Sequence, residues 1–151
     1  MRRIDPYLLW LGHAGDGRNF RAAFDAGIRA LVQLAMEEPA LQTPRELLYC
    51  RIPIVDGGGN RVESLTLAVR TVENLLRLGV PTLVCCSGGM SRAPAVAAAA
   101  LASVDGTDPG ECLRRIITDQ PHDVALPLWQ ELVALLLTLR AVGDNPPPDC
   151  R

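Results

Sequence analysis

A thiol and a guanidinium enclose a short segment of mostly small residues. In chain order, the segment is Cys86-Ser87-Gly88-Gly89-Met90-Ser91-Arg92. The apolar residues 82–85 before it predict a buried strand, and the alanine-rich residues after it predict a helix with Pro94 in its first turn. A glycine turn that leads into a helix N-terminus offers backbone N–H groups and the positive end of the helix dipole to a phosphate. The segment therefore predicts a phosphate-binding loop.

The residue types at the two ends of this loop indicate what happens to the phosphate. The planar guanidinium of Arg92 can hold two phosphate oxygens at once. Positive surroundings favour a thiolate over a thiol, so we expect Cys86 to be an activated nucleophile. Gly88 and Gly89 allow a close approach of the backbone that a side chain would block. The loop thus predicts both the binding of a phosphate and nucleophilic attack on it.

A carboxylate upstream supplies a second chemical group. Residues 47–54 alternate in polarity and predict a strand, which places Asp56 in a loop just beyond the strand end. Catalytic groups in parallel sheets collect at such positions. A phosphate ester needs a proton on its leaving oxygen, and a carboxyl group on a loop over the pocket can supply it. The alternative, that residues 56–59 form only a turn, stays open.

The elements around these loops alternate between strand and helix. Strands are predicted at residues 7–12, 28–35, 47–54 and 80–86, and helices at residues 19–26, 60–78, 92–104, 108–119 and 126–142. Asn60 and Glu63 predict a capping box at the start of the second helix, and Gly79 its end. Residues 12–17 are predicted to be a loop. The order predicts an α/β fold with a mostly parallel central sheet and helices on both faces.

The two loops together resemble the dual-specificity phosphatases of the cysteine-dependent protein tyrosine phosphatase superfamily. Their signature is a His-Cys-x-x-Gly-x-x-Arg-Ser/Thr loop preceded by an Ile-Pro-x-x-Asp element, and the resemblance spans about residues 8–137. It implies that Cys86 is the nucleophile that forms a phosphocysteine, that Arg92 clamps the phosphate, and that Asp56 is general acid and then base. It also implies no metal or other cofactor. The phosphate would be bound by the backbone N–H groups of Ser87, Gly88, Gly89, Met90, Ser91 and Arg92.

The chain departs from this signature at two positions. Cys85 stands where the family has histidine, and Ala93 stands where it has a hydroxyl residue. In the family that hydroxyl helps the cysteine sulfur to leave, so Ala93 implies slow breakdown of the phosphoenzyme, with Ser91 as a candidate replacement. Strand alternation points Cys85 away from Cys86, which predicts a small core residue.

Three functions are consistent with these residues. The first is a phosphatase that hydrolyses phosphomonoesters, with a phosphorylated protein or a small phosphomonoester as substrate. The second is a catalytically impaired phosphate-binding protein that recognises a phosphorylated partner through the same loop. The third is a thiol oxidoreductase that uses Cys85 and Cys86.

Chain length and composition indicate the number of domains, the compartment and the kinds of partner to expect. The 151 residues, 48% of them hydrophobic, suffice for one domain, predicted at residues 1–142 and followed by a flexible proline-rich tail at 143–151. A net charge of −2 predicts neither a nucleic acid nor a membrane partner. Five irregularly spaced cysteines and no apolar leader predict a cytoplasmic protein. The two histidines, His13 and His122, are far apart and predict no metal site. The apolar residues 132–139 leave room for a dimer face, so a monomer or weak homodimer is expected.

Overall fold

Four parallel strands and one short antiparallel strand form the central sheet. A computed structural model describes residues 1–143 of the chain. The strands are β1 (Arg2–Arg3), β2 (Leu9–Gly12), β3 (Ala30–Ala35), β4 (Leu48–Ile54) and β5 (Thr82–Cys85). They lie in the order β1-β2-β5-β3-β4, and only β1 runs antiparallel to its neighbour. The predicted mostly parallel sheet is confirmed.

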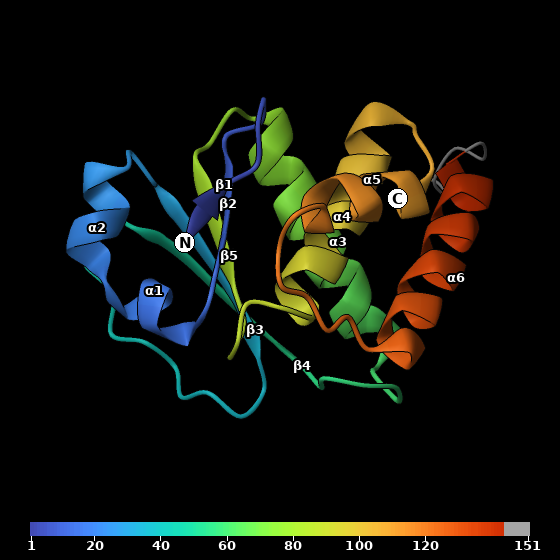
Figure 1. Cartoon of the computed structure of the whole chain (residues 1–151), viewed down its shortest axis with the longest axis horizontal. Helices are drawn as coiled ribbons and strands as arrows, with labels where there is room; N and C mark the ends of the chain where they lie inside the picture. The colour runs from blue at the N-terminus through green and yellow to red at the C-terminus, as the bar shows by residue number, and fades with distance from the viewer. Residues whose placement is uncertain (144–151) are drawn as a thin grey trace, which may run out of the picture.

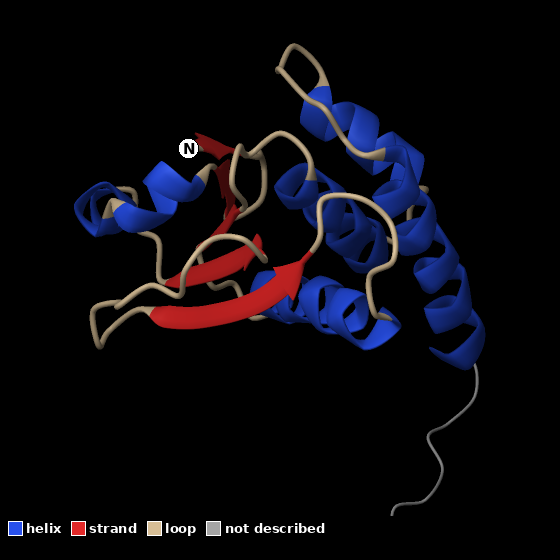
Figure 2. Cartoon of the chain, turned by 90° about the horizontal axis from the view of Figure 1, so that it is seen from below, coloured by secondary structure: helices blue, strands red, loops and turns tan. Residues whose placement is uncertain are grey.

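Helices cover both faces of this sheet, as Figures 1 and 2 show. The helices are α1 (Ala14–Arg18), α2 (Phe20–Asp25), α3 (Val62–Arg77), α4 (Arg92–Asp105), α5 (Pro109–Ile117) and α6 (Leu126–Gly143). The two short helices pack on one face over a small apolar cluster, and the four longer helices enclose the main core on the other face. The predicted helix-covered α/β architecture is therefore confirmed.

Strand β5 holds a central position in the sheet, and its largely apolar sequence suits that position. All four residues of β5 are buried, and the strand pairs in parallel with β2 on one side and β3 on the other. Central strands of a parallel sheet are buried on both faces, so their sequences are continuous runs of apolar residues. Because β2, β3, β4 and β5 run in the same direction, the loops that follow them all emerge at one edge of the sheet. The candidate site is built at that edge.

The helix α4 lies at the centre of the helical layer. Its first eleven residues, Arg92 to Ala102, are all buried, and it contacts α3, α5 and α6. Most of these residues are alanines, whose small side chains let the backbones of neighbouring elements approach closely. The close packing fixes the N-terminus of α4 directly behind the loop that follows β5.

Three local predictions are corrected by the structure. The predicted capping box is wrong: Arg61 is the N-cap of α3 and makes no side-chain cap, because the Asn60 side chain bonds to the loop before it. The predicted loop at residues 12–17 is largely α1, whose first N–H groups donate to the Nδ1 atom of His13. Strand β1 was not predicted.

The other helix ends agree more closely with the predictions. Asp108 caps α5 by accepting a hydrogen bond from the Glu111 N–H, and Gly79 follows the end of α3 with a φ of 67°. The predicted tail begins at Gly143, which is the last residue of α6, and its remainder lies outside the described residues. Among residues 1–143, no helix combines the length and the apolar character needed to cross a membrane.

Candidate active site

The loop of residues 86–92, called here the Cys86 loop, connects β5 to α4. Cys86 lies directly after β5 and is only 2% exposed, at the base of the loop. Gly89 has a φ of 73°, and a Cβ atom there would lie 3.0 Å from the carbonyl carbon and oxygen of Gly12. Only glycine satisfies both conditions. At Gly88, by contrast, the nearest atom to an added Cβ is the mobile methyl group of Met90 at 3.7 Å.

The backbone N–H groups of this loop are available to an anion. Within residues 1–143, no protein group accepts a hydrogen bond from the N–H groups of residues 87–91. Ser91 is the N-cap of α4 and makes no side-chain cap, so the positive end of this fourteen-residue helix also faces the loop. Converging N–H groups at a helix N-terminus form an anion-binding arrangement.

Arg92 is buried behind the loop and held in a fixed orientation. Its side chain is 2% exposed; Nη1 and Nη2 donate to the two carboxylate oxygens of Glu37, at 2.6 and 2.5 Å, and Nη1 also donates to the Ile54 carbonyl at 3.1 Å. The Nε–H has no hydrogen-bond partner among the described residues. A buried donor without a partner is costly, so a ligand acceptor at Nε is favoured.

Charge interactions between Arg92 and Glu37 are strong. The bidentate hydrogen bond to Arg92 lowers the pKa of Glu37 to about 2, although partial burial opposes the shift. The same hydrogen bond raises the pKa of Arg92, against the effect of burial, and nearby Cys86 adds to the rise. Glu37 was not identified from the sequence. Its position two residues after buried β3, next to the strand that precedes Cys86, was the available signal.

Asp56 lies beside the C-terminal end of the Cys86 loop. Its Oδ1 atom accepts a hydrogen bond from the Ser91 hydroxyl at 2.6 Å, and its Oδ2 atom is 3.9 Å from Nε of Arg92. The side chain is 45% exposed, so it can reach both solvent and a bound ester. The three residues predicted to be catalytic, Cys86, Arg92 and Asp56, therefore come together at one edge of the sheet.

The hydroxyl group missing at Ala93 is not replaced in the structure. Ala93 is fully buried, and the Ser91 hydroxyl is engaged by Asp56 and by the Ala125 N–H at 3.2 Å. Ser91 thus orients Asp56 and the segment before α6, and none of its hydrogen bonds goes to Cys86. The structure assigns Ser91 a different contact from the one predicted.

Cys85 points to the opposite face of the sheet from Cys86, as strand alternation predicts. Cys86 belongs to the main core, whereas Cys85 belongs to the smaller cluster under α1 and α2. Its sulfur would lie 2.9 Å from a Cβ atom at Gly17, which shows how closely α1 packs on the sheet. Burial raises the pKa of Cys85 to about 12. A buried, protonated thiol is a poor redox partner, which disfavours the oxidoreductase hypothesis.

The sequence of the chain matches a known protein family. A family model described as "Polymorphic toxin system, DSP-PTPase phosphatase" matches residues 12–105, which include Cys86, Arg92 and Asp56. The chain belongs to this DSP-PTPase phosphatase family. No curated protein matches the chain.

Solved structures of dual-specificity phosphatases share the fold. Human DUSP28 is 24% identical with a TM-score of 0.80, covering 93% of this chain and 99% of that chain. A mouse dual specificity phosphatase complexed with zinc tungstate is 25% identical with a TM-score of 0.80, covering 97% and 92%. DUSP15 is 19% identical with a TM-score of 0.78, covering 96% of each chain. The arrangement of the sheet and helices is therefore that of dual-specificity phosphatases.

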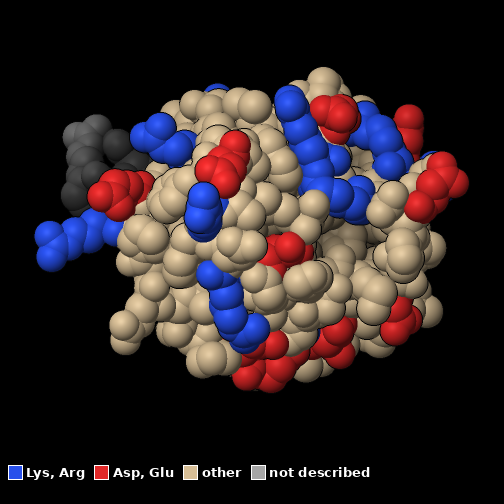
Figure 3. Space-filling view, turned by 60° about the vertical axis from the view of Figure 1, so that its left-hand side comes forward, with Lys and Arg blue, Asp and Glu red and all other residues tan. Residues whose placement is uncertain are grey.

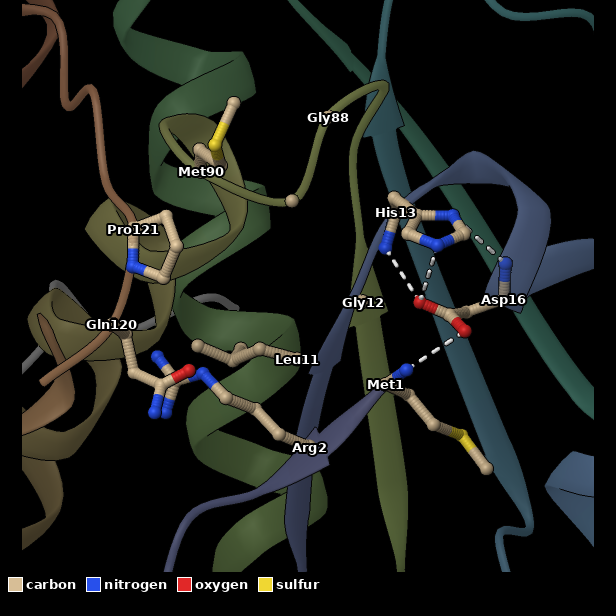
Figure 4. A pocket seen from close by; sticks show the side chains of 11 residues that line it. Met1, Arg2, Leu11, Gly12, His13, Asp16, Gly88, Met90, Gln120 and Pro121 are labelled. Carbon is tan, nitrogen blue, oxygen red and sulfur yellow. Dashed lines mark hydrogen bonds and ion pairs between the residues drawn. The ribbon is translucent and has the colours of Figure 1, made fainter.

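A cavity of about 300 Å³ adjoins the Cys86 loop of this phosphatase-family chain (Figure 4). The turn of residues 88–90 forms one wall, and His13, Asp16, Arg2 and Gln120 line the rest. The cavity lining does not include Cys86, Arg92 or Asp56. The cavity therefore borders residues 88–90 of the Cys86 loop but does not contain the three residues predicted to be catalytic.

Neither histidine lies in a cluster of metal-binding type. His13 caps α1, and the His122 Nδ1 atom contacts the Gln120 carbonyl at 3.1 Å. Within residues 1–143 there is no group of three or more His, Cys, Asp or Glu side chains placed to hold a metal ion.

On the face shown in Figure 3, arginine and acidic side chains are interspersed.

Proposed function

We propose that this protein is a cysteine-dependent phosphatase that hydrolyses phosphotyrosine, and also phosphoserine and phosphothreonine, through a phosphocysteine intermediate without a metal. The observation that carries the proposal is the buried Arg92, whose fork is fixed by Glu37 while its Nε–H lacks a partner beside a loop of free N–H groups. A phosphate dianion supplies the acceptors that these donors lack. Cys86 lies at the base of the same loop.

In the first step of the proposed reaction, the Cys86 thiolate attacks phosphorus. The sulfur–phosphorus bond forms as the bond between phosphorus and the leaving oxygen breaks. Asp56, held beside the loop by Ser91, gives its proton to that oxygen. Arg92 and the loop N–H groups stabilise the charge on the transferring phosphoryl group.

In the second step, water attacks the phosphocysteine. Asp56 is now a carboxylate and takes a proton from the water as the oxygen–phosphorus bond forms. The sulfur–phosphorus bond breaks, phosphate leaves and the Cys86 thiolate is restored. The leaving sulfur receives no hydroxyl hydrogen bond from position 93, where the residue is a buried alanine, so this step is expected to limit turnover.

The decisive experiment measures the release of p-nitrophenol from p-nitrophenyl phosphate between mildly acidic and neutral pH. We expect steady turnover by the reduced wild-type protein and none by Cys86→Ser, because a serine hydroxyl is a poor nucleophile without a base. Vanadate should inhibit the wild type. Turnover that survives in Cys86→Ser would disprove the proposal.

A second candidate function is phosphate recognition without efficient turnover. It is favoured by Ala93, together with the engagement of the Ser91 hydroxyl elsewhere. This function predicts a burst of about one equivalent of p-nitrophenol followed by no turnover, or no release at all, while vanadate still binds. Rapid-mixing measurements of the burst separate it from the first function.

The proposed nucleophile also bears on the compartment. Cys50, Cys85, Cys86 and Cys112 are free thiols. A catalytic thiolate requires a reducing environment, so we propose that the protein acts in the cytoplasm.

A further inference from the structure

The loop that carries Asp56 has a backbone sequence that does not favour one conformation by itself. Residues 55–60, called here the Asp56 loop, include three consecutive glycines. Gly57 and Gly59 have φ angles of 151° and 83°, and an added Cβ at either would meet no atom within 4 Å. Glycine has more conformational freedom to lose than any other residue, so contacts from elsewhere must select one conformation.

Asn60 closes this loop on itself. Its Oδ1 atom accepts from the Val55 N–H at 2.8 Å, and its Nδ2 group donates to the Gly57 carbonyl at 2.9 Å and the Val55 carbonyl at 3.3 Å. One amide side chain thereby bonds both to the residue before Asp56 and to the residue after it. The contact is local and defines the width of the loop.

Glu131 attaches the closed loop to α6. Its Oε1 atom accepts from the Gly59 N–H at 2.6 Å, and its Oε2 atom accepts from the N–H and the Nδ2 group of Asn60, both at 3.3 Å. At Gly58 a Cβ atom would lie 3.0 Å from the Pro127 side chain, so the loop backbone packs directly against α6. Hydrogen bonds and packing therefore join the Asp56 loop, which follows β4, to α6.

The opposite side of the loop is held by Ser91, which donates to Asp56 from the end of the Cys86 loop. Asp56 thus lies between an attachment to the phosphate-binding loop and an attachment to α6. We infer that Glu131 is a positioning residue: by accepting from Gly59 and Asn60 it holds the Asp56 carboxyl where it delivers a proton to the leaving oxygen. The inference rests on the proposed function and deepens it.

The chemistry of the leaving group provides the test. The phenol of tyrosine has a pKa of about 10, so its oxygen leaves poorly without a proton. The nitro group of p-nitrophenol stabilises the anion, which leaves with little help. Loss of acid positioning should therefore slow phosphotyrosine hydrolysis more than p-nitrophenyl phosphate hydrolysis. A general loss of folded protein would slow both equally.

The first variant is Glu131→Gln, which keeps the shape but replaces one acceptor oxygen by a donor. The new amide nitrogen would face a donor of Asn60 or Gly59, so one attachment is lost. Because breakdown of the phosphocysteine is expected to limit kcat, the comparison uses kcat/KM, which reports the step in which the leaving oxygen is protonated. We expect kcat/KM on a phosphotyrosine peptide to fall about tenfold, less than the 10²–10⁴ that a whole general acid contributes, and kcat/KM on p-nitrophenyl phosphate to fall less than about twofold. The matched control is Glu111→Gln on α5, whose carboxylate makes no hydrogen bond or ion pair in the described chain.

A compensating pair of substitutions sharpens the test. Asn60→Asp alone places two carboxylates together and should reduce kcat/KM on the phosphotyrosine peptide further than Glu131→Gln. In the double variant the new amide at 131 donates to the new carboxylate at 60, which restores one bond with donor and acceptor exchanged. The double variant should therefore lose less activity than the product of the two single losses.

Hydrogen exchange gives a readout that does not need catalysis. The Gly59 and Asn60 amides donate to Glu131, so at least one of them should exchange faster in Glu131→Gln, and both should exchange at the wild-type rate in Glu111→Gln. Unchanged exchange, or equal losses of kcat/KM on the two substrates, would overturn the inference. A wild type without cysteine-dependent turnover would instead overturn the proposed function and the catalytic role of Glu131, while the exchange result would still decide whether Glu131 holds the loop.

Discussion

The Cys86 loop and the Asp56 loop both follow parallel strands and both contain adjacent glycines, yet they are held in different ways. In the Cys86 loop, Gly89 is pressed against the backbone of Gly12, and Arg92 is buried in a bidentate ion pair. In the Asp56 loop, a Cβ atom added at Gly57 or Gly59 would meet no atom within 4 Å, and hydrogen bonds with half-exposed side chains define the conformation. One loop is shaped by packing and the other by polar attachments.

This difference matches what each step of the proposed reaction needs. A phosphoryl group requires donors that are already in place, because reorganisation during the reaction would cost rate. A proton donor must also admit the substrate and release the product, which favours a loop with a lower cost of opening. Rigid packing at the phosphate and adjustable attachments at the acid are consistent with those two tasks.

The largest expected effect comes from Arg92→Lys, which keeps the charge but removes the fork. A lysine cannot bond both oxygens of Glu37 and present a further donor to phosphate. We expect kcat/KM on p-nitrophenyl phosphate to fall by about 10³-fold, the scale of losing one preorganised donor. Circular dichroism and vanadate titration distinguish loss of binding from loss of fold. A decrease of less than tenfold would contradict the assigned role of the fork.

Alanine at selected glycines tests the packing difference between the two loops. Gly59→Ala meets only the cost of a left-handed backbone, about 1–2 kcal/mol. Gly89→Ala meets that cost and a collision with Gly12, which should add about 1–3 kcal/mol in the free energy of unfolding. Gly88→Ala, with no positive φ, should be within about 0.5 kcal/mol of wild type. Urea denaturation of the three variants measures the order, and equal losses at positions 59 and 89 would remove the proposed contrast.

The smallest effect concerns the pH dependence of the Glu37 contact. Because Arg92 lowers the folded-state pKa of Glu37 to about 2, the contact stabilises the fold above the ordinary pKa of 4.5 and is lost as the pH falls from there toward 2. Glu37 is 55% exposed, so the stability difference from Glu37→Gln should be below about 1 kcal/mol at pH 7. It should stay constant above pH 5 and shrink toward pH 2. Urea titrations at several pH values check this, and a difference that grows on acidification would exclude the ion pair as its source.

Sequence reasoning recovered the Cys86 loop because its parts are contiguous. The strand, the turn and the helix that shape the loop lie within one short segment, so spacing alone indicates the arrangement. Asp56 was found because it lies two residues beyond the end of a strand at the same edge. Glu37 and Glu131 were missed because their partners lie 55 and about 70 residues away in the chain. Surface glutamates are common, and nothing local separates these two from the others.

Two local errors had different origins: a competing local hydrogen bond in one case, and a contact with a distant residue in the other. Asn60 matched a capping signal but uses its side chain to close the Asp56 loop. Residues 12–17 contain glycines that disfavour a helix, yet Gly17 is what allows α1 to lie against Cys85. The partners of Asn60 lie within five residues of it but compete with capping, whereas Cys85 lies far from Gly17 in the chain.

The burial of α4 has a consequence for how substrate preference diverges among relatives of this chain. A helix enclosed over eleven successive residues offers no position that can be enlarged without moving its neighbours. The floor of the proposed phosphate site is therefore constrained by the interior of the domain. New preferences must instead arise in the connecting segments around it, at residues 36–38, 55–60 and 119–125. These segments can vary in length and charge while the chemistry below them stays unchanged.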